Sequence, residues 1–377
     1  MTRIMLSITT SCLALALAAG AQAQDIQLGA VYPLTGGVSY DGITKLNGAK
    51  LAVEEINATG GVLGRKVALS SEDGACNPAQ SASSAEKLIN QQKVVAIIGA
   101  ICSSGSGAIA EVVKKYGIPQ VTGVSTAERL TEQGNPWFFR ATTTTTLNGM
   151  SMGASIMKAA GGKRFAFIVT SDDWGRSASA SYGETFKKLG GEVTATEFFD
   201  RNDTDFNAAL TKIRASRPEA IFSTGGFQNA ANITKQARQL GIQVPILGEG
   251  AYTAEQFNKL VAPFTDKVFG VIEWVSALDT PKNKKFIADY QAKYKEMPNK
   301  FSAAGYQTVY IVAEAIKRAG STEGEKLRDA LSKTDFNGIM GNYKFDAKGQ
   351  AYNFDVYLTE NKGNDTVVRE VVKIQKQ

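Results

Sequence analysis

Residues 94–126 read VVAIIGAICSSGSGAIAEVVKKYGIPQVTGVST, and this stretch decides the fold class. It opens on a short apolar run, 94–98, rich in β-branched side chains, which is typical of a buried strand in a parallel sheet. A turn of small residues, 99–107, leads into residues 108–116, which have the apolar spacing of an amphipathic helix. A second short strand and a second polar loop, 123–126, complete the stretch. The order strand, turn, helix, strand predicts a parallel α/β sheet.

The glycine-serine turn between the first strand and the helix has the composition of an anion site. It places backbone N–H groups and serine hydroxyls at the positive end of a helix, where a carboxylate is favoured. Two polar loops at the carboxyl ends of neighbouring parallel strands are also where open α/β sheets bind ligands. The alternative is that both loops are ordinary connections. The clustering of serines, and the recurrence of the pattern later in the chain, favour a site.

The pattern recurs in the second half of the chain. AIFSTGGF followed by GIQVPILGEG resembles AIIGAICSS followed by GIPQVTG, and the separation from Gly99 to Pro119 equals that from Gly225 to Pro245. Two similar α/β lobes that each offer loops at strand ends can face each other across a cleft. The repeat therefore predicts a clamp that closes on a ligand.

The rest of the chain supplies strands and helices for both lobes. The first part predicts strands at 25–32 and 67–71, helices at 46–56 and 79–90, and a turn over 33–42. Further helices are predicted at 150–160, 179–189, 206–215, 230–240, 281–294, 302–319 and 325–332. Further strands are predicted at 165–170, 193–199, 220–223, 244–247, 268–275, 337–345, 352–359 and 367–374.

The run of threonines at 142–146 is predicted to be a strand that crosses out of the first lobe, with low-complexity sequence as the alternative. We therefore predict an α/β fold of two doubly wound parallel-sheet lobes joined by a three-strand hinge. The N-terminal lobe is expected to contain residues 24–141 plus 275–352. The C-terminal lobe is expected to contain residues 142–274 plus 353–377.

The N-terminus has the features of a cleaved secretory signal peptide over residues 1–23. Arg3 precedes a short apolar run, 12–19, and Ala21-Gln22-Ala23 fits a small-residue cleavage site. The run is too short to span a bilayer, and no other stretch is long and apolar enough. We therefore expect a soluble protein of the periplasm.

Composition argues against several classes of function. The net charge is +6, or +5 once Arg3 is removed, and the lysines are scattered, so we expect no nucleic-acid binding. The chain contains no histidine, which removes the commonest general base and metal ligand and any Ser-His-Asp triad. We expect a protein that is not an enzyme and that holds no metal and no cofactor.

Two cysteines, Cys76 and Cys102, remain after removal of the signal peptide. In an oxidising compartment a disulfide between them is expected, with a reactive thiol as the alternative. Closing a loop of this length stabilises a protein by roughly 3 kcal/mol in the chain-entropy model. Because Cys102 lies in the serine turn, the bridge would also stiffen that turn.

The chain resembles the periplasmic branched-chain amino acid binding proteins of ATP-binding-cassette (ABC) importers, over its whole mature length. The matching segments are GAVYPLTGG, GAKLAVEEINATGGVLGRKV, EDGACNPAQSA, GAICSSGS, GIPQVTGVSTAERLT and LGEG. The resemblance implies the type I periplasmic binding fold, two lobes that close on a ligand, and a disulfide between Cys76 and Cys102. It also implies a membrane permease as partner and a monomeric protein.

Carried over residue by residue, the resemblance implies a ligand carboxylate held by Ser103 and Thr126, with Ser104 in the same turn. The carbonyl of Val124 and the carboxylate of Glu249 would receive the ligand ammonium. An acid between two glycines, as Glu249 is, can face a cleft where an ammonium compensates its burial. The alternative for Glu249 is an exposed loop carboxylate.

The family has tyrosines where this chain has Trp174 and Phe227. Both lack the phenol oxygen, which favours a more apolar pocket and a large side group on the ligand. Tyr40, Asp41 and Phe301 are further candidates for the rim and the side-chain pocket.

The first hypothesis for function is a receptor that delivers a hydrophobic amino acid, branched-chain or aromatic, to an importer. The second keeps the clamp and changes the ligand to an aromatic or 2-oxo carboxylate without an amine. A sensory subunit of a membrane receptor needs the same clamp. A periplasmic enzyme is disfavoured by the lack of histidine, of a metal-ligand cluster and of a phosphate-loop lysine motif.

Overall fold

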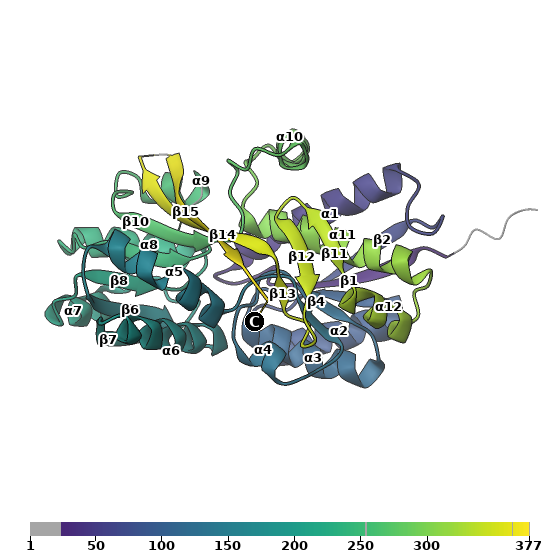
Figure 1. The fold of residues 1–377 in the computed structure, drawn as a ribbon, viewed down its shortest axis with the longest axis horizontal. Helices are drawn as coiled ribbons and strands as arrows, with labels where there is room; N and C mark the ends of the chain where they lie inside the picture. The colour runs from purple at the N-terminus through teal and green to yellow at the C-terminus, as the bar shows by residue number, and fades with distance from the viewer. Residues whose placement is uncertain (1–23, 253–254, 364, 377) are drawn as a thin grey trace, which may run out of the picture.

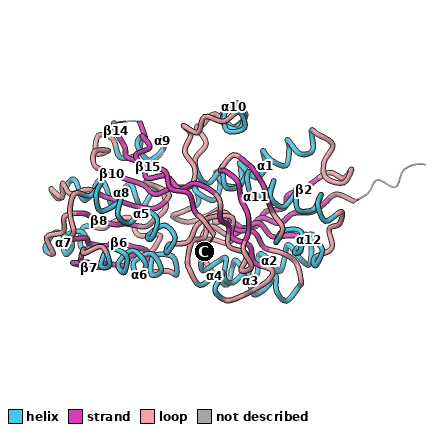
Figure 2. Tube along the Cα trace, in the orientation of Figure 1, coloured by secondary structure: helices cyan, strands magenta, loops and turns pink. Residues whose placement is uncertain are grey.

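The computed structural model describes residues 24–252, 255–363 and 365–376. The predicted signal peptide, residues 1–23, lies outside the described residues. The chain forms two lobes that lie side by side, each built around one large sheet (Figures 1 and 2). No helix in the described ranges combines the length and the hydropathy that crossing a bilayer requires.

The N-terminal lobe is built on a five-stranded, fully parallel sheet of order β2-β1-β3-β4-β5. Its strands are β1 (Ile26–Tyr32), β2 (Val67–Asp73), β3 (Ala96–Gly99), β4 (Gln120–Thr122) and β5 (Phe138–Arg140). Two pairs of helices pack with this sheet: α1 (Ser39–Ala58) with α11 (Lys300–Ala319), and α2 (Pro78–Gln92) with α3 (Ser103–Tyr116).

The C-terminal lobe has a seven-stranded sheet of order β15-β14-β10-β9-β8-β6-β7. Its five parallel strands are β6 (Arg164–Thr170), β7 (Glu192–Phe199), β8 (Ala220–Ser223), β9 (Ile246–Glu249) and β10 (Val268–Ile272). Counted along the chain, these five have the same order as the first sheet: second, first, third, fourth, fifth. The antiparallel strands β14 (Phe354–Lys362) and β15 (Asp365–Ile374) extend the sheet at one edge (Figure 1).

The remaining elements fill in around the two sheets. The helices of the C-terminal lobe are α5 (Thr145–Ala160), α6 (Asp173–Lys188), α7 (Asn207–Ala215), α8 (Phe227–Gln239) and α9 (Glu255–Val261). The late helices α10 (Pro281–Tyr294) and α12 (Gly324–Ser332) and the short α4 (Arg129–Glu132) complete the helical set that the structure describes. A small antiparallel sheet contains β11 (Asp335–Gly338), β12 (Gly341–Phe345) and β13 (Ala351–Tyr352).

Three connections join the lobes: residues 141–144 after β5, residues 273–280 between β10 and α10, and Asn353 between β13 and β14. The two-lobe α/β fold is thereby confirmed, and the exact lobe boundaries stay a prediction. The expected strand at 142–146 is wrong. Thr144 instead caps α5, its hydroxyl accepting a hydrogen bond from the Leu147 N–H (3.0 Å), so the threonine run ends in a helix.

Several helices begin earlier than the sequence predicts. The expected loops at 99–107, 171–175 and 225–229 each contain the first turn of a helix, as does the expected turn at 33–42. Their first turns consist largely of glycine, serine and polar residues, and the apolar spacing starts only one turn later, so periodicity places the start too late. At α6 the Asp172 side chain caps the helix by accepting from the Gly175 N–H (3.1 Å).

Two expected strands are each divided in the structure. The predicted strand at 337–345 is the hairpin of β11 and β12, in which Gly338 pairs with Gly341 and Gly341 has φ of 110°. The predicted strand at 352–359 is interrupted at Asn353, whose φ of 71° is incompatible with an extended strand. Apolar alternation runs through both interruptions and conceals them.

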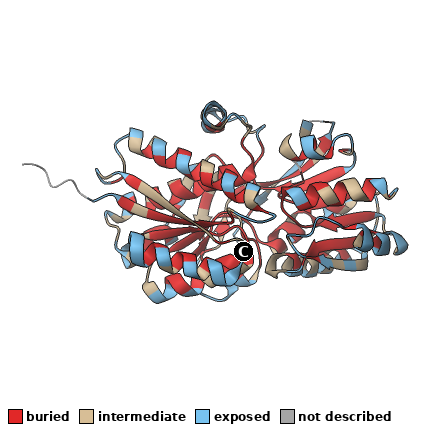
Figure 3. Ribbon diagram, turned by 180° about the vertical axis from the view of Figure 1, so that it is seen from behind, coloured by how far each residue is buried: buried red, intermediate tan, exposed pale blue. Residues whose placement is uncertain are grey.

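The core lies along the central strands of both sheets and the helix faces that cover them (Figure 3). The disulfide between Cys76 and Cys102 is present, with Cα atoms 5.4 Å apart. Cys102 is the N-cap of α3, and Cys76 directly precedes Asn77, the N-cap of α2. The bridge therefore fastens together the starts of two neighbouring helices.

The helices α1 and α11 approach each other closely at two glycines. A Cβ added at Gly48 would lie 1.9 Å from the carbonyl oxygen of Ser302, and one added at Gly305 would lie 2.0 Å from that of Lys45. Since both obstacles are backbone atoms, a side chain at either position would push the helices apart.

We expect Gly48→Ala to lower the free energy of unfolding by about 1–3 kcal/mol, the usual effect of overpacking. Gly183→Ala in α6 is the matched control, because its nearest atom, Phe167 Cε2, is 3.5 Å from the added Cβ. Gly183→Ala should raise the free energy of unfolding by about 0.5–1 kcal/mol, because alanine is more favourable than glycine inside a helix. Urea unfolding of both variants measures the two changes, and changes of the same sign would contradict the expectation.

Candidate functional site

A cavity lies between the two lobes, at the carboxyl ends of strands from both sheets. The space within it that a water-sized sphere can occupy is small, about 30 Å³, so the two walls lie close together. The lining residues are Asp41, Ile101, Ser103, Val124, Thr126, Trp174, Arg201, Gly225, Gly226, Glu249, Gly250, Ala251, Lys300 and Phe301.

Most of the residues predicted for the site come together here. The predicted residues that line the cavity are Ser103, Val124, Thr126, Trp174, Glu249, Asp41 and Phe301. The predicted residues that do not line it are Ser104, Tyr40 and Phe227. The Phe227 ring lies behind the wall, with its centroid 5.8 Å from that of Phe301 and 5.6 Å from that of Tyr40. The aromatic corner of the site is therefore built in two layers, with Phe301 in front.

The N-terminal lobe contributes hydroxyl groups and the start of a helix. Ser103 is the first residue of α3, and its Oγ accepts a hydrogen bond from the Ala127 N–H (3.2 Å), which leaves its own proton to donate. The Thr126 side chain is 5% exposed and its hydroxyl has no hydrogen-bond partner among the described residues. Helix α3 has no side-chain cap and no acid in its first turn. This wall therefore suits an anion.

A buried serine pair holds the two loops of this wall in register. The hydroxyls of Ser106 and Ser125 are 2.7 Å apart, and Ser106 Oγ also accepts from the Ala100 N–H (2.7 Å). Ser125 Oγ donates to the Ile101 carbonyl (2.9 Å). The loop after β3 and the loop after β4 are thus fixed relative to each other before any ligand arrives.

The C-terminal lobe contributes a buried acid, Glu249, at the end of β9. Its Oε1 accepts from Asn148 Nδ2 (2.7 Å) and from the Tyr182 hydroxyl (2.8 Å), and its Oε2 accepts from Trp174 Nε1 (3.0 Å). Burial raises the pKa of Glu249, while these three hydrogen bonds act to lower it. A carboxylate has about four acceptor positions, so one on Oε2 remains for a ligand.

Sequence reasoning missed the two partners Asn148 and Tyr182. They lie on α5 and α6, far in the chain from Glu249, and no local pattern sets them apart from surface polar residues. Tyr182 is fully buried and restores a phenol at this wall. The indole N–H of Trp174 supplies a second donor, so the substitution of an expected tyrosine by tryptophan keeps a polar contact.

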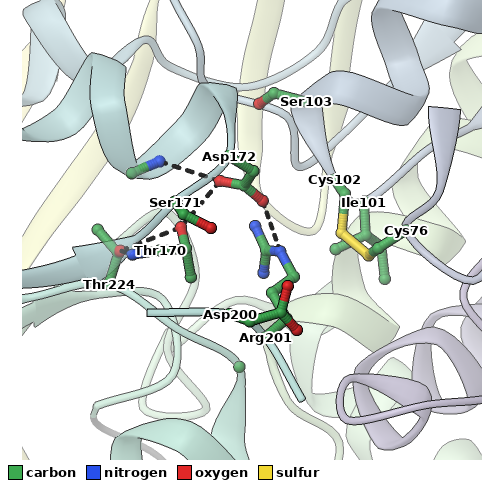
Figure 4. A network of polar contacts seen from close by, with 12 residues as sticks. Cys76, Ile101, Cys102, Ser103, Thr170, Ser171, Asp172, Asp200, Arg201 and Thr224 are labelled. Atoms are coloured by element: carbon green, nitrogen blue, oxygen red, sulfur yellow. Dashed lines mark hydrogen bonds and ion pairs between the residues drawn. A yellow bond between two sulfur atoms is a disulfide. The ribbon is translucent and has the colours of Figure 1, made fainter. Parts of the chain in front are cut away.

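Two cations that the sequence did not single out, Arg201 and Lys300, also line the cavity. Arg201 pairs with Asp172 (Nε to Oδ2, 2.6 Å; Figure 4). It also lies over the Trp174 ring, 5.1 Å from the ring centroid. Burial acts to raise the pKa of Asp172, but Arg201 and the capped Gly175 N–H hold it below its usual range. Arg201 thus has a carboxylate partner of its own.

Lys300 is the first residue of α11 and pairs with Glu273 (Nζ to Oε2, 3.2 Å). Both side chains are at least nine-tenths buried. Glu273 also accepts from the Thr142 hydroxyl (3.2 Å), so one carboxylate links two of the connections between the lobes to the start of α11. The cavity and the hinge share this contact.

Asp41, in the first turn of α1, is 2% exposed. Burial raises its pKa to about 7, although the Phe227 N–H and the charges of Arg201 and Lys300 act to lower it. Nearby Lys45 is fully buried, and burial together with the charge of Lys300 lowers its pKa to about 7. Two groups beside the cavity thus titrate near neutrality.

For Asp41 the linkage has a definite sign. The carboxyl ionises near pH 4 in the unfolded chain and near pH 7 in the folded protein, so its contribution to stability is full below about pH 4 and is lost as pH rises through 7. We compare the free energies of unfolding in urea, without ligand, of Asp41→Asn and wild type. As pH rises from about 4.5 to about 8, we expect the variant to become more stable relative to wild type. Lys45 titrates in both proteins. A difference between the two free energies of unfolding that does not change with pH would contradict a raised pKa for Asp41.

The family model described as periplasmic binding protein matches residues 25–366. The chain belongs to the periplasmic binding protein family. A relative from Pseudomonas aeruginosa, named amino acid binding protein, is 30% identical over 344 residues, which is 90% of this chain and 91% of the relative. The family consists of binding proteins rather than enzymes.

Two solved structures extend the comparison. The leucine binding protein of Thermotoga maritima is 30% identical, with a TM-score of 0.85, over 92% of this chain and 99% of that chain. The branched-chain amino acid transporter substrate binding protein of Streptococcus pneumoniae, solved with isoleucine, is 28% identical, with a TM-score of 0.84, over 94% and 100%. The resemblance to branched-chain amino acid binding proteins is confirmed. In the described residues no group of three or more cysteine and acid side chains is arranged to hold a metal.

Proposed function

We propose that this protein is the periplasmic substrate-binding protein of an ABC importer and that it binds an α-amino acid between its lobes. One observation carries the proposal: a hydroxyl-lined, uncapped helix start on one wall of the cavity faces a buried carboxylate, Glu249, on the other. A zwitterion matches this pair of walls. Ile101, Trp174 and Phe301 supply apolar surface for a branched-chain or aromatic side group.

In this proposal the N-terminal lobe holds the carboxylate of the ligand, and both lobes contact its ammonium. Ser103 and Thr126 donate to its carboxylate, and the Val124 carbonyl and Glu249 accept from its ammonium. Because the contacts come from both lobes, the ligand binds the closed arrangement better than the open one and shifts the population toward it. The closed, liganded form is the signal that a membrane permease, or a sensory receptor in its place, would recognise. The protein acts as a monomer and performs no chemistry on its ligand.

We expect Ser103→Ala to weaken binding of leucine, isoleucine or phenylalanine by about tenfold or more, since it removes a hydrogen bond to a charged group. Ser104→Ala is the matched control: it changes the next residue of the same helix turn, outside the cavity, and should bind like wild type. Isothermal titration calorimetry measures both. Equal losses in the two variants, or none in either, would count against a carboxylate at this wall.

A second candidate ligand is a carboxylate without an amine, and one observation favours it. Glu249 already accepts three hydrogen bonds from protein donors and so has partners without an ammonium. Leucine and its 2-oxo counterpart, 4-methyl-2-oxopentanoate, form a matched pair that differs at this group. If the ligand is an amino acid, Glu249→Gln weakens leucine binding by about tenfold or more and leaves the 2-oxo acid no weaker. Unchanged affinity for leucine would exclude the ammonium contact.

A further inference from the structure

One carboxyl oxygen of a residue that lines the cavity has no hydrogen-bond partner among the described residues. Asp41 lines the cavity and is 2% exposed, and its Oδ1 is buried without a hydrogen-bond partner among the described residues. A buried acceptor left unpaired is unfavourable, and native proteins seldom keep one without a reason. The oxygen is therefore placed to accept a hydrogen bond from something that enters the cavity.

Neighbouring protein groups occupy the other side of this carboxylate. A Cβ added at Gly226 would lie 2.6 Å from Asp41 Oδ2, so that oxygen packs against the start of α8, where the Phe227 N–H interacts with the carboxyl. The two cations nearby are committed elsewhere, Arg201 to Asp172 and Lys300 to Glu273. Neither of them pairs with Oδ1.

In the proposed binding mode neither the carboxylate nor the ammonium of the amino acid uses Asp41, which leaves Asp41 for the side group. The carboxylate wall is Ser103 with Thr126, and the ammonium acceptor is Glu249. Asp41 instead lies against Gly226, the residue before Phe227, whose ring packs against that of Phe301. This corner combines apolar surface with a single unpaired acceptor.

We propose that the ligand is an amino acid whose side group carries a hydrogen-bond donor, a hydroxyl or an amide, and that this donor binds Asp41 Oδ1. The inference rests on the proposed function and narrows it, because it excludes a purely hydrocarbon side group as the preferred one. A ligand with a purely hydrocarbon side group would leave Asp41 Oδ1 without a hydrogen-bond donor. The apolar walls contact the body of the side group and Asp41 contacts its polar end.

Matched ligand pairs test this inference on the wild-type protein. Threonine and valine, asparagine and leucine, and tyrosine and phenylalanine are each similar in shape and differ in the donor. By calorimetry we expect the donor-bearing member to bind about tenfold or more tighter in the pair that fits the cavity best. Asp41→Leu, which removes the acceptor and keeps the branched shape of the side chain, should abolish that preference. Asp289→Asn, which changes a surface acid on α10, should retain it.

The outcomes separate the two levels of the argument. If valine, leucine and phenylalanine each bind as tightly as their partners, the inference is wrong while the proposed function stands. If Asp41→Leu folds and keeps the preference, Asp41 is not its cause and the inference is also overturned. If no amino acid of any pair binds the wild type, both the inference and the proposed function fail. The wild-type comparison decides the matter even if the Asp41 variant does not fold.

Discussion

The site depends on accommodating a carboxyl group away from water. Glu249 is 3% exposed, and an isolated charge at such a depth is strongly disfavoured. Three donors from α5 and α6 compensate it. Asn148 and Trp174 reach it from the first turns of their helices, and Tyr182 reaches it from further along α6. The need to bring Asn148, Trp174 and Tyr182 to one point ties both helices to the end of β9. The inner wall of the C-terminal lobe is built around that requirement.

The same principle applies to the charged pairs beside the cavity. Lys300 with Glu273 is a buried pair and Arg201 with Asp172 is a half-buried one. In each pair one charge compensates the other, and removing one partner of the buried pair would leave an uncompensated buried charge. Because Glu273 also contacts Thr142, the charges beside the ligand are continuous with the segments that join the lobes. Movement of the lobes therefore alters the surroundings of the cavity directly.

Much of this could be predicted from the sequence, and the missing parts have a physical explanation. The buried parallel strands have short apolar runs of β-branched residues, and the repeat between residues 94–126 and the second half matches the shared strand order of the two sheets. Helix starts were placed too late because capping residues carry no apolar spacing. Arg201, Lys300 and Tyr182 could not be predicted as site residues, since only the packing of distant segments gives them their neighbours.

The position of Cys102 at the start of α3 has one more consequence. Serine, threonine, aspartate and asparagine are the usual residues at such a position, and each would turn its own oxygen onto the free N–H groups of the first turn. A half-cystine has only a weakly accepting sulfur and is held instead by its covalent partner. The disulfide thus fixes this end of the helix covalently, and the N–H groups of the first turn remain without a side-chain cap and able to bind an anion.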